Sequence, residues 1–225
     1  MTEICDRYTR SRIIFGSKFE KIQNTKVVVF GVGGVGGFVV DCLYRSGIKH
    51  ITIVDKDTFD ITNQNRQIGA EHINESKVEV LGKIYEGITP IRASVNADFL
   101  DSFDVMSFDY IVDAIDDINA KVEIAKIAQH KPLGHYIVST GSAKKLNPLN
   151  IQVANIWKTY GDKFARKFRE NLKKAHIKKP FKAVFSPEVP QCKDLGSFSA
   201  VTAAFGLTIA SEIIQNILKG ESNAR

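Results

Sequence analysis

Residues 27–37 read Val-Val-Val-Phe-Gly-Val-Gly-Gly-Val-Gly-Gly, and residues 51–55 read Ile-Thr-Ile-Val-Asp. The first run is apolar and β-branched, and it ends in a GxGxxG pattern with a helix-like segment behind it. Glycines at such a turn let the backbone approach a phosphate closely, and the helix N-terminus offers unpaired N–H groups to an anion. Together with Asp55, the acid at the end of the second run, the pattern predicts a Rossmann-type nucleotide site. The alternative is a glycine turn with a purely structural role. The predicted nucleotide-binding residues are Gly31, Gly33, Gly34, Gly36 and, for a ribose hydroxyl, Asp55.

Strand and helix patterns alternate through the first 140 residues. The predicted strands are 27–31, 50–55, 91–95, 109–113 and 136–140, and the predicted helices are 34–46, 75–87 and 119–130. Such alternation predicts an α/β fold with a Rossmann-like, mixed but mainly parallel sheet and helices on both faces. We assign residues 1–146 to this nucleotide-binding region and residues 147–225 to a C-terminal extension of the same domain.

The pattern changes in the C-terminal extension. Residues 151–156 alternate between apolar and polar side chains, as a half-buried strand does. Residues 177–198 contain three prolines and predict a loop that crosses to the last helix. Between these segments, apolar side chains recur every four residues and predict an amphipathic helix with basic residues on its other faces, through Phe164, Phe168 and Leu172.

Composition favours a cytoplasmic protein without a membrane span. The chain is 44% apolar and 25% charged, and its three cysteines form no CxxC pair, so neither a structural zinc site nor a disulfide framework is indicated. A reducing cytoplasm is the natural setting for such a chain. The last apolar segment, 200–218, is interrupted by polar side chains near its end, which favours a buried helix over a membrane span: Glu212, Gln215 and Asn216.

Polar and basic residues follow the second predicted strand. Arg66 offers a planar fork of donors to phosphate oxygens, Asn63 offers an amide, and Lys77 opens the next predicted helix as a second cation. A nucleoside triphosphate needs such groups, whereas a dinucleotide enzyme has no general need for them. Ligands of α/β sheets bind beyond the carboxyl ends of strands, which favours phosphate binding over the alternative of solvated surface charges.

Three acids close the predicted strand 109–113: Asp113, Asp116 and Asp117. Acids at a strand's carboxyl end can hold Mg²⁺ through one or two carboxylates while phosphates and water fill the other positions. We assign the metal to Asp116 and expect Asp113 to orient neighbouring groups or to cap the following helix. The alternative is that Asp116 or Asp117 is simply the N-cap of that helix.

These motifs resemble a known family. GVGGVG at 31–36, VDKDTFDITNQNRQ at 54–67, Lys77 and VDAIDD at 112–117 resemble the adenylating domain of the ubiquitin-activating-enzyme superfamily, which includes the ThiF, MoeB and HesA proteins. The opening residues 6–16 also resemble that family's start. The resemblance implies a dimer that binds ATP and Mg²⁺ and attaches AMP to a carboxylate. It implies ribose binding by Asp55, phosphate binding by Asn63, Arg66 and Lys77, metal binding by Asp116, and catalysis across the dimer by Arg10, with Arg12 as a rival.

The second half resembles the dehydratase branch of this superfamily, whose members act on threonylcarbamoyladenosine beside the tRNA anticodon. The matching stretches include 151–153, 163–167, 184–188 and 196–206. The resemblance implies ATP-dependent cyclisation of the threonylcarbamoyl group through a carboxyl adenylate, with AMP and pyrophosphate as products. It leaves open a partner protein that transfers sulfur or electrons.

Three other functions are alternatives for this sequence. An adenylating activator of a ubiquitin-like sulfur-carrier protein is the main alternative, although zinc-binding CxxC pairs, common in such activators, are missing. A nucleotide-sensing module without catalysis and an NAD-dependent dehydrogenase are weaker alternatives. Cys192 lies where some superfamily members place a thioester-forming cysteine, but a loop cysteine without covalent duty is favoured, because the cyclisation needs no thioester.

The basic charge is concentrated in one segment. Residues 158–182 hold ten basic and two acidic residues, a net charge of +8, whereas the whole chain carries +6. A charge run is commonly a solvated helix face, but beside an adenylating core contact with an RNA backbone is the better interpretation. The predicted tRNA-binding residues are Lys163, Arg166, Lys167, Lys173 and Lys174.

Overall fold

The computed structural model describes residues 5–220 and contains a seven-stranded sheet in the order β3-β2-β1-β4-β5-β7-β6. The strand pairs are parallel except β6–β7, which is antiparallel. The predicted mixed, mainly parallel sheet is therefore confirmed. Its strands are β1 (Lys26–Phe30), β2 (His50–Asp55), β3 (Thr89–Arg92), β4 (Tyr110–Asp113), β5 (Tyr136–Ser139), β6 (Gln152–Asn155) and β7 (Lys182–Phe185).

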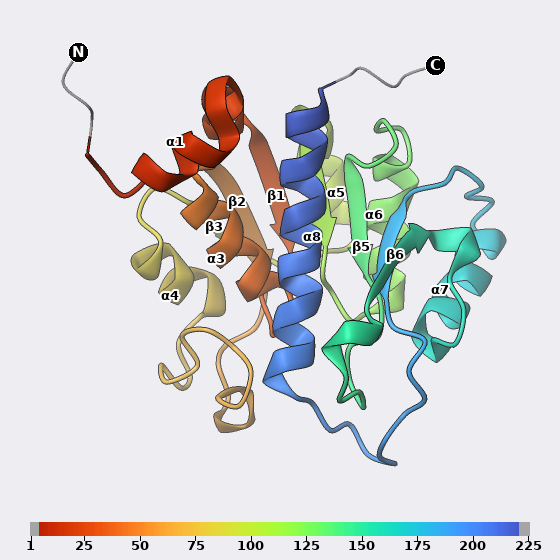
Figure 1. Cartoon of the computed structure of the whole chain (residues 1–225). Coiled ribbons are helices and arrows are strands. Elements are labelled where there is room, and N and C mark those ends of the chain that lie inside the picture. The colour runs from red at the N-terminus through yellow and green to blue at the C-terminus, as the bar shows by residue number, and fades with distance from the viewer. Residues whose placement is uncertain (1–4, 221–225) are drawn as a thin grey trace.

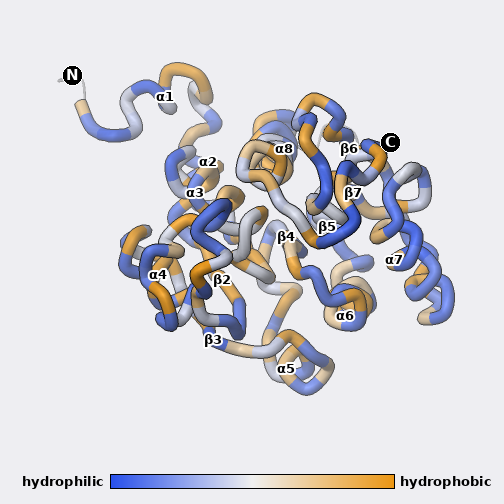
Figure 2. Tube along the Cα trace, turned by 90° about the horizontal axis from the view of Figure 1, so that it is seen from below, coloured by the Kyte–Doolittle hydropathy of each residue, from blue (hydrophilic) through white to orange (hydrophobic). Residues whose placement is uncertain are grey.

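Helices cover both faces of the sheet, as Figure 2 shows in a view along it. The first helices are α1 (Thr9–Phe15), α2 (Phe19–Asn24), α3 (Gly36–Ser46) and α4 (Lys77–Ile84). They are followed by α5 (Ala97–Ser102), α6 (Ile118–Ala128), α7 (Lys163–Lys174) and α8 (Ser199–Lys219). Helices α3 and α8 lie on one face, and α5 and α6 lie on the other (Figures 1 and 2).

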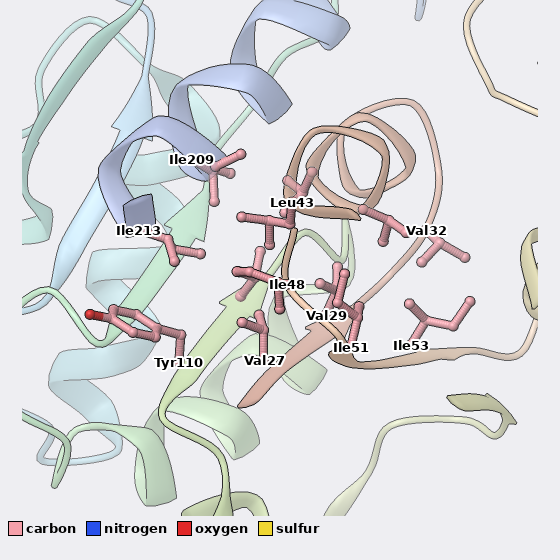
Figure 3. Close-up of a cluster of buried hydrophobic side chains, with 14 of the residues drawn as sticks. Val27, Val29, Val32, Leu43, Ile48, Ile51, Ile53, Tyr110, Ile209 and Ile213 are labelled. Atoms are coloured by element: carbon pink, nitrogen blue, oxygen red, sulfur yellow. The ribbon is translucent and has the colours of Figure 1, made fainter. Parts of the chain in front are cut away.

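Side chains along β1 point alternately to the two faces of the sheet, and each face has its own hydrophobic cluster. Val27 and Val29 point to the α3–α8 side and join a cluster with Leu43 of α3 and Ile213 of α8 (Figure 3). Val28 and Phe30 belong to the opposite cluster, which includes residues of α6 and α7. A strand covered on both faces needs apolar side chains at successive positions, which accounts for the unbroken run Val27–Phe30.

Two predicted elements needed correction, and three short helices were not predicted. Strand β3 ends at Arg92, so the predicted strand 91–95 was displaced toward the C-terminus. The predicted loop 177–198 contains β7, whose short apolar run fills the sheet between β5 and β6. Prolines on both sides of β7 suggest a loop, whereas its pairing partners are distant in sequence. The short helices α1, α2 and α5 were not predicted.

Helix α8 is, among the residues described, the one helix that is long and apolar enough by length and composition to cross a membrane. In this structure its Val201, Phe205, Ile209 and Ile213 are buried in the core beside α3. Gly206 permits this contact, because a Cβ there would lie 2.5 Å from the carbonyl oxygen of Val35. The helix therefore packs as the core helix that the sequence predicted.

Candidate active site

The carboxyl ends of β1, β2, β4 and β5 open onto one cavity of about 660 Å³. Residues from distant stretches of the chain converge on it, as the carboxyl-end rule for parallel sheets anticipates. Eight of the predicted site residues line it: Gly31, Gly33, Gly34, Asp55, Asn63, Arg66, Lys77 and Asp116. Neither Gly36 nor Arg10 is among the lining residues.

The glycines of the turn have different roles. Gly31 has a φ of +81°, and a Cβ there would lie 2.9 Å from the backbone of Ala114, so the turn packs directly on the loop after β4. A Cβ at Gly36 would lie 1.8 Å from the carbonyl oxygen of Gly31. Gly36 therefore closes the turn from behind, while Gly33 and Gly34 lie on the cavity side.

Asp55 links the end of β2 to the glycine turn. Its Oδ2 accepts a hydrogen bond from the Val32 N–H at 2.8 Å, and its Oδ1 accepts one from the Asp57 N–H at 2.9 Å. Each carboxylate oxygen has two lone pairs, so the fixed side chain can still accept hydrogen bonds from a ligand hydroxyl. The backbone bonds hold this carboxylate in place before any ligand binds.

The two predicted cations lie on one side of the cavity. Lys77 begins α4, its side chain is 8% exposed, and its Nζ lies 3.4 Å from Oδ2 of Asp57. Arg66 donates through Nη1 to the carbonyl oxygen of Thr62 at 3.0 Å and to Oδ1 of Asn65 at 2.9 Å. Its stem crosses Gly34, where a Cβ would lie 3.2 Å from Cγ of Arg66. A buried ammonium with one long ion pair is suited to a further anionic partner.

Asn63 ends a short 3₁₀ turn, Ile61–Asn63, that follows β2. Its Oδ1 accepts a hydrogen bond from the Asp60 N–H at 3.2 Å and completes a capping box. Its amide NH₂ makes no hydrogen bond within residues 5–220 and can donate to a ligand in the cavity.

The three acids after β4 differ in environment. Asp117 caps α6, because its Oδ1 accepts hydrogen bonds from the N–H groups of Asn119 at 2.7 Å and Ala120 at 3.3 Å. Asp113 is fully buried and does not cap the helix, so its predicted orienting role fits and the alternative capping role is wrong. Asp116 is exposed at the cavity, and its carboxylate makes no hydrogen bond or ion pair within the described part of the chain.

Asp113 forms a buried ion pair that supports the loop carrying Asp116. Lys121 Nζ lies 2.7 Å from its Oδ1, and both side chains are 0% exposed. The same Oδ1 accepts a hydrogen bond from the Ile115 N–H, and its Oδ2 accepts one from the Tyr136 hydroxyl, both at 3.2 Å. Burial raises the pKa of Asp113 and lowers the pKa of Lys121, against the attraction between them.

Further cavity residues were missed at the sequence level. Residues 140–143 follow β5 at the same sheet edge. The predicted strand 136–140 could have indicated them, because it ends at that edge. Gln67 follows Arg66, and its buried Oε1 has no hydrogen-bond partner among residues 5–220. Ser197 lies in the stretch 196–206 that resembles the dehydratase branch, but it was not predicted as a site residue. Its carbonyl oxygen accepts a hydrogen bond from Asn65 Nδ2 at 3.2 Å.

The predicted tRNA-binding residues lie on α7, beside α6. All five are exposed, while Ala165, Phe168 and Leu172 of the same helix are buried. Asp162 caps the helix by accepting a hydrogen bond from the Ala165 N–H at 3.0 Å. In Figure 2 the outer surface of α7 is largely hydrophilic.

Helix α1 carries Arg10 on its exposed surface, away from the cavity lining. Arg12 makes two 2.6 Å hydrogen bonds to the carboxylate of Asp6, and this contact lowers the pKa of Asp6 to about 2. Ile13 and Ile14 on the same helix are 79% and 75% exposed. Exposed apolar side chains that lie together are a feature of an association surface.

Cys192 is exposed and does not line the cavity. Its thiol donates to the carbonyl oxygen of Asp194 at 3.3 Å. Among the described residues, no hydrogen bond joins its sulfur to a basic side chain.

The fold and the cavity define an adenylating enzyme of the Rossmann type, and the ThiF family model matches residues 6–225. The chain belongs to the ThiF family. It is 35% identical over 82% of its length to the tRNA threonylcarbamoyladenosine dehydratase of Bacillus subtilis, 76% of which is covered. It is 30% identical to the enzyme of that name from Haemophilus influenzae, over 94% of this chain and 92% of the relative.

A solved structure of a dehydratase has the same fold as this chain. The crystal structure of the Escherichia coli tRNA N6-threonylcarbamoyladenosine dehydratase in complex with ATP superimposes with a TM-score of 0.89. The match covers 97% of this chain and 96% of the other, at 26% sequence identity. The likeness therefore includes α7 and α8 as well as the nucleotide-binding half.

Proposed function

We propose that this protein is an ATP-dependent tRNA threonylcarbamoyladenosine dehydratase. The observation that supports this proposal most strongly is that Arg66, Lys77 and Asp116 line one cavity. The chain around this cavity matches dehydratases over nearly its full length. ATP is the co-substrate, and a tRNA that carries the modified adenosine is the acceptor.

We assign the nucleotide contacts residue by residue. The ribose hydroxyls bind Asp55, and the phosphates lie across Gly33 and Gly34 toward Asn63, Arg66 and Lys77. Mg²⁺ fits Asp116: the described residues hold no group of three His, Cys, Asp or Glu side chains for a metal, and Mg²⁺ on nucleotides takes one or two carboxylates and phosphate oxygens. The ion would supply charge neutralisation for the phosphates.

The chemistry then follows from charge and position. A threonyl carboxylate oxygen bonds to the α-phosphorus of ATP and releases pyrophosphate, which makes the carboxyl carbon electrophilic. The carbamoyl nitrogen attacks that carbon within the same substrate, and AMP leaves with the oxygen of the eliminated water. Ring closure gains the large effective molarity of an intramolecular attack. The protein contributes positioning and cationic donors from Arg66 and Lys77 rather than a nucleophile.

The experiment that tests this function is AMP release from ATP in the presence of different acceptors. A tRNA carrying threonylcarbamoyladenosine should stimulate AMP formation, and the same tRNA without the modification should not. Stimulation by a sulfur-carrier protein in place of the modified tRNA would favour the alternative activator function.

We further propose a homodimer with active sites shared between chains. Arg12 is bound to Asp6, which leaves the exposed Arg10 as the arginine that reaches the partner's ATP, next to the apolar Ile13 and Ile14. Arg10→Ala and Asp116→Ala chains should each be inactive alone and partly active when mixed, because a mixed dimer contains one intact site. Turnover by the mixture and the mass of the particle in solution check this; a monomer under assay conditions contradicts it.

The exposed cations of α7 are proposed to hold the tRNA backbone. Replacing Arg166, Lys167, Lys173 and Lys174 with Gln should weaken tRNA binding and lower the slope of log affinity against log salt by about one unit per lost phosphate contact. ATP affinity should stay unchanged, because none of the four lines the nucleotide cavity.

A matched control removes the same charge elsewhere. Gln at four exposed lysines outside α7 should leave the salt slope near that of the wild type: Lys21, Lys26, Lys49 and Lys83. Equal losses of tRNA affinity in the two quadruple variants would indicate that the basic face of α7 is solvated and does not bind tRNA.

The setting follows from the substrate. Cys5, Cys42 and Cys192 are free thiols, in keeping with the cytoplasm where tRNA is modified. A sulfur-transfer or redox partner stays a prediction.

A further inference from the structure

A second hollow lies between the start of α6 and the side of α7. We name it the α6–α7 groove; its volume is about 310 Å³. One wall is the segment Asp116–Asn119, and the other is formed by Phe164, Lys167 and Asn171 of α7. The three α7 residues lie three and four positions apart and therefore share one helix face.

The groove joins the nucleotide cavity. Asp116, Asp117 and Phe164 line both hollows, so the groove meets the cavity at the end where Asp116 lies. A substrate carboxylate that enters from the groove therefore arrives beside the residue assigned to the metal and phosphates. A tRNA helix is too wide for the cavity itself, so the reacting nucleotide must leave its stack and enter through an opening of this kind.

The walls have the chemistry of a nucleoside site. Phe164 is half-buried and offers a ring face on which an unstacked base can lie. Lys167 makes no ion pair within the described chain and is the one residue of the five predicted tRNA contacts that lines the groove. Asn171 donates through Nδ2 to the carbonyl oxygen of Lys167 at 2.9 Å, which leaves its own side-chain oxygen as an acceptor.

Side chains of both charges line the groove. Asp117 is held by two backbone N–H groups of α6, and Lys167 supplies a cation opposite it. The remaining basic residues of α7 lie on the same helix outside the groove, where an RNA backbone leading to the groove would pass.

We propose that the α6–α7 groove is the acceptor subsite, which takes the unstacked, carboxylate-bearing adenosine of the tRNA. Phe164 stacks on the base, and Lys167 binds the threonyl carboxylate before it reaches ATP. This inference rests on the proposed function and assigns its acceptor to a particular surface.

The test measures how strongly the protein prefers tRNA with the threonylcarbamoyl group over the same tRNA without it. Dissociation constants are determined for one tRNA with and without the threonylcarbamoyl group, and their ratio is compared among variants. The wild type should prefer the modified tRNA. Lys167→Gln should lower this preference by about tenfold, since a charge-assisted contact to the carboxylate is lost. Phe164→Leu should lower it as well while keeping apolar volume against Lys121, whose Nζ lies 6.0 Å from the Phe164 ring.

Lys174→Gln is the matched control. It removes one charge from the same helix but lies outside the groove, so it should weaken both tRNAs alike and keep the preference. The thermal unfolding midpoint, measured in each variant, reports whether the fold is intact. A wild type without preference, or a preference that survives in both Lys167→Gln and Phe164→Leu, overturns the subsite. AMP formation by the wild type in the same preparation tests the proposed function separately.

Discussion

Asp116→Ala is expected to lower the rate of AMP formation by about a hundredfold or more. The carboxylate is the single acid after β4 that is neither buried in an ion pair nor engaged as a helix cap in this structure. Loss of one contact that stabilises metal or transition-state charge commonly costs ~3 kcal/mol or more of activation free energy. Turnover of the modified tRNA at saturating ATP, with varied Mg²⁺, measures the effect.

The fold should survive this substitution, since the Asp116 side chain makes no hydrogen bond within residues 5–220. The thermal unfolding midpoint should therefore match that of the wild type. Asp101→Ala, which removes an exposed carboxylate from α5, serves as the control and should keep full activity. Near-normal turnover in a folded Asp116→Ala protein would remove this residue from the mechanism.

Lys121→Met is expected to destabilise the protein by about 3–5 kcal/mol, because it leaves the buried carboxylate of Asp113 without its partner. The free energy of unfolding, from denaturant titration, measures this. The double variant Asp113→Asn with Lys121→Met removes both charges and should recover most of the loss, since the amide oxygen can still accept from the Ile115 N–H.

The turnover rates of the variants should rank as their stabilities do, because Asp113 positions the loop that leads to Asp116. The double variant should turn over faster than Lys121→Met. A Lys121→Met protein within about 1 kcal/mol of the wild type would show that the pair does not carry a buried charge.

The nucleotide half was predictable because its signals are local. The β-branched run, the glycine turn and Asp55 lie within 29 residues, 27–55, and each acts on its neighbours in the chain. One topological rule, that parallel strands present their carboxyl ends at one edge, then brought Asn63, Arg66 and Asp116 together.

What was missed depends on contacts between distant segments. Strand β7 is four residues long and owes its place to pairing with β5 and β6, while the hydrogen bond from Asn65 to Ser197 spans 132 positions. Lys121 carried a usable signal, because it lies on the same helix face as Ile124, Ala125 and Ala128, all buried. A lysine on an apolar face predicts a buried acidic partner, here Asp113.

We expect this protein to remove water from threonylcarbamoyladenosine in tRNA at the expense of ATP. The most direct measurement is the mass of that nucleoside after the modified tRNA is incubated with the protein, ATP and Mg²⁺ and then digested. The expected product is a nucleoside lighter by one water, formed in step with AMP and absent when ATP is omitted. An unchanged nucleoside mass in the presence of folded, ATP-binding protein would contradict it.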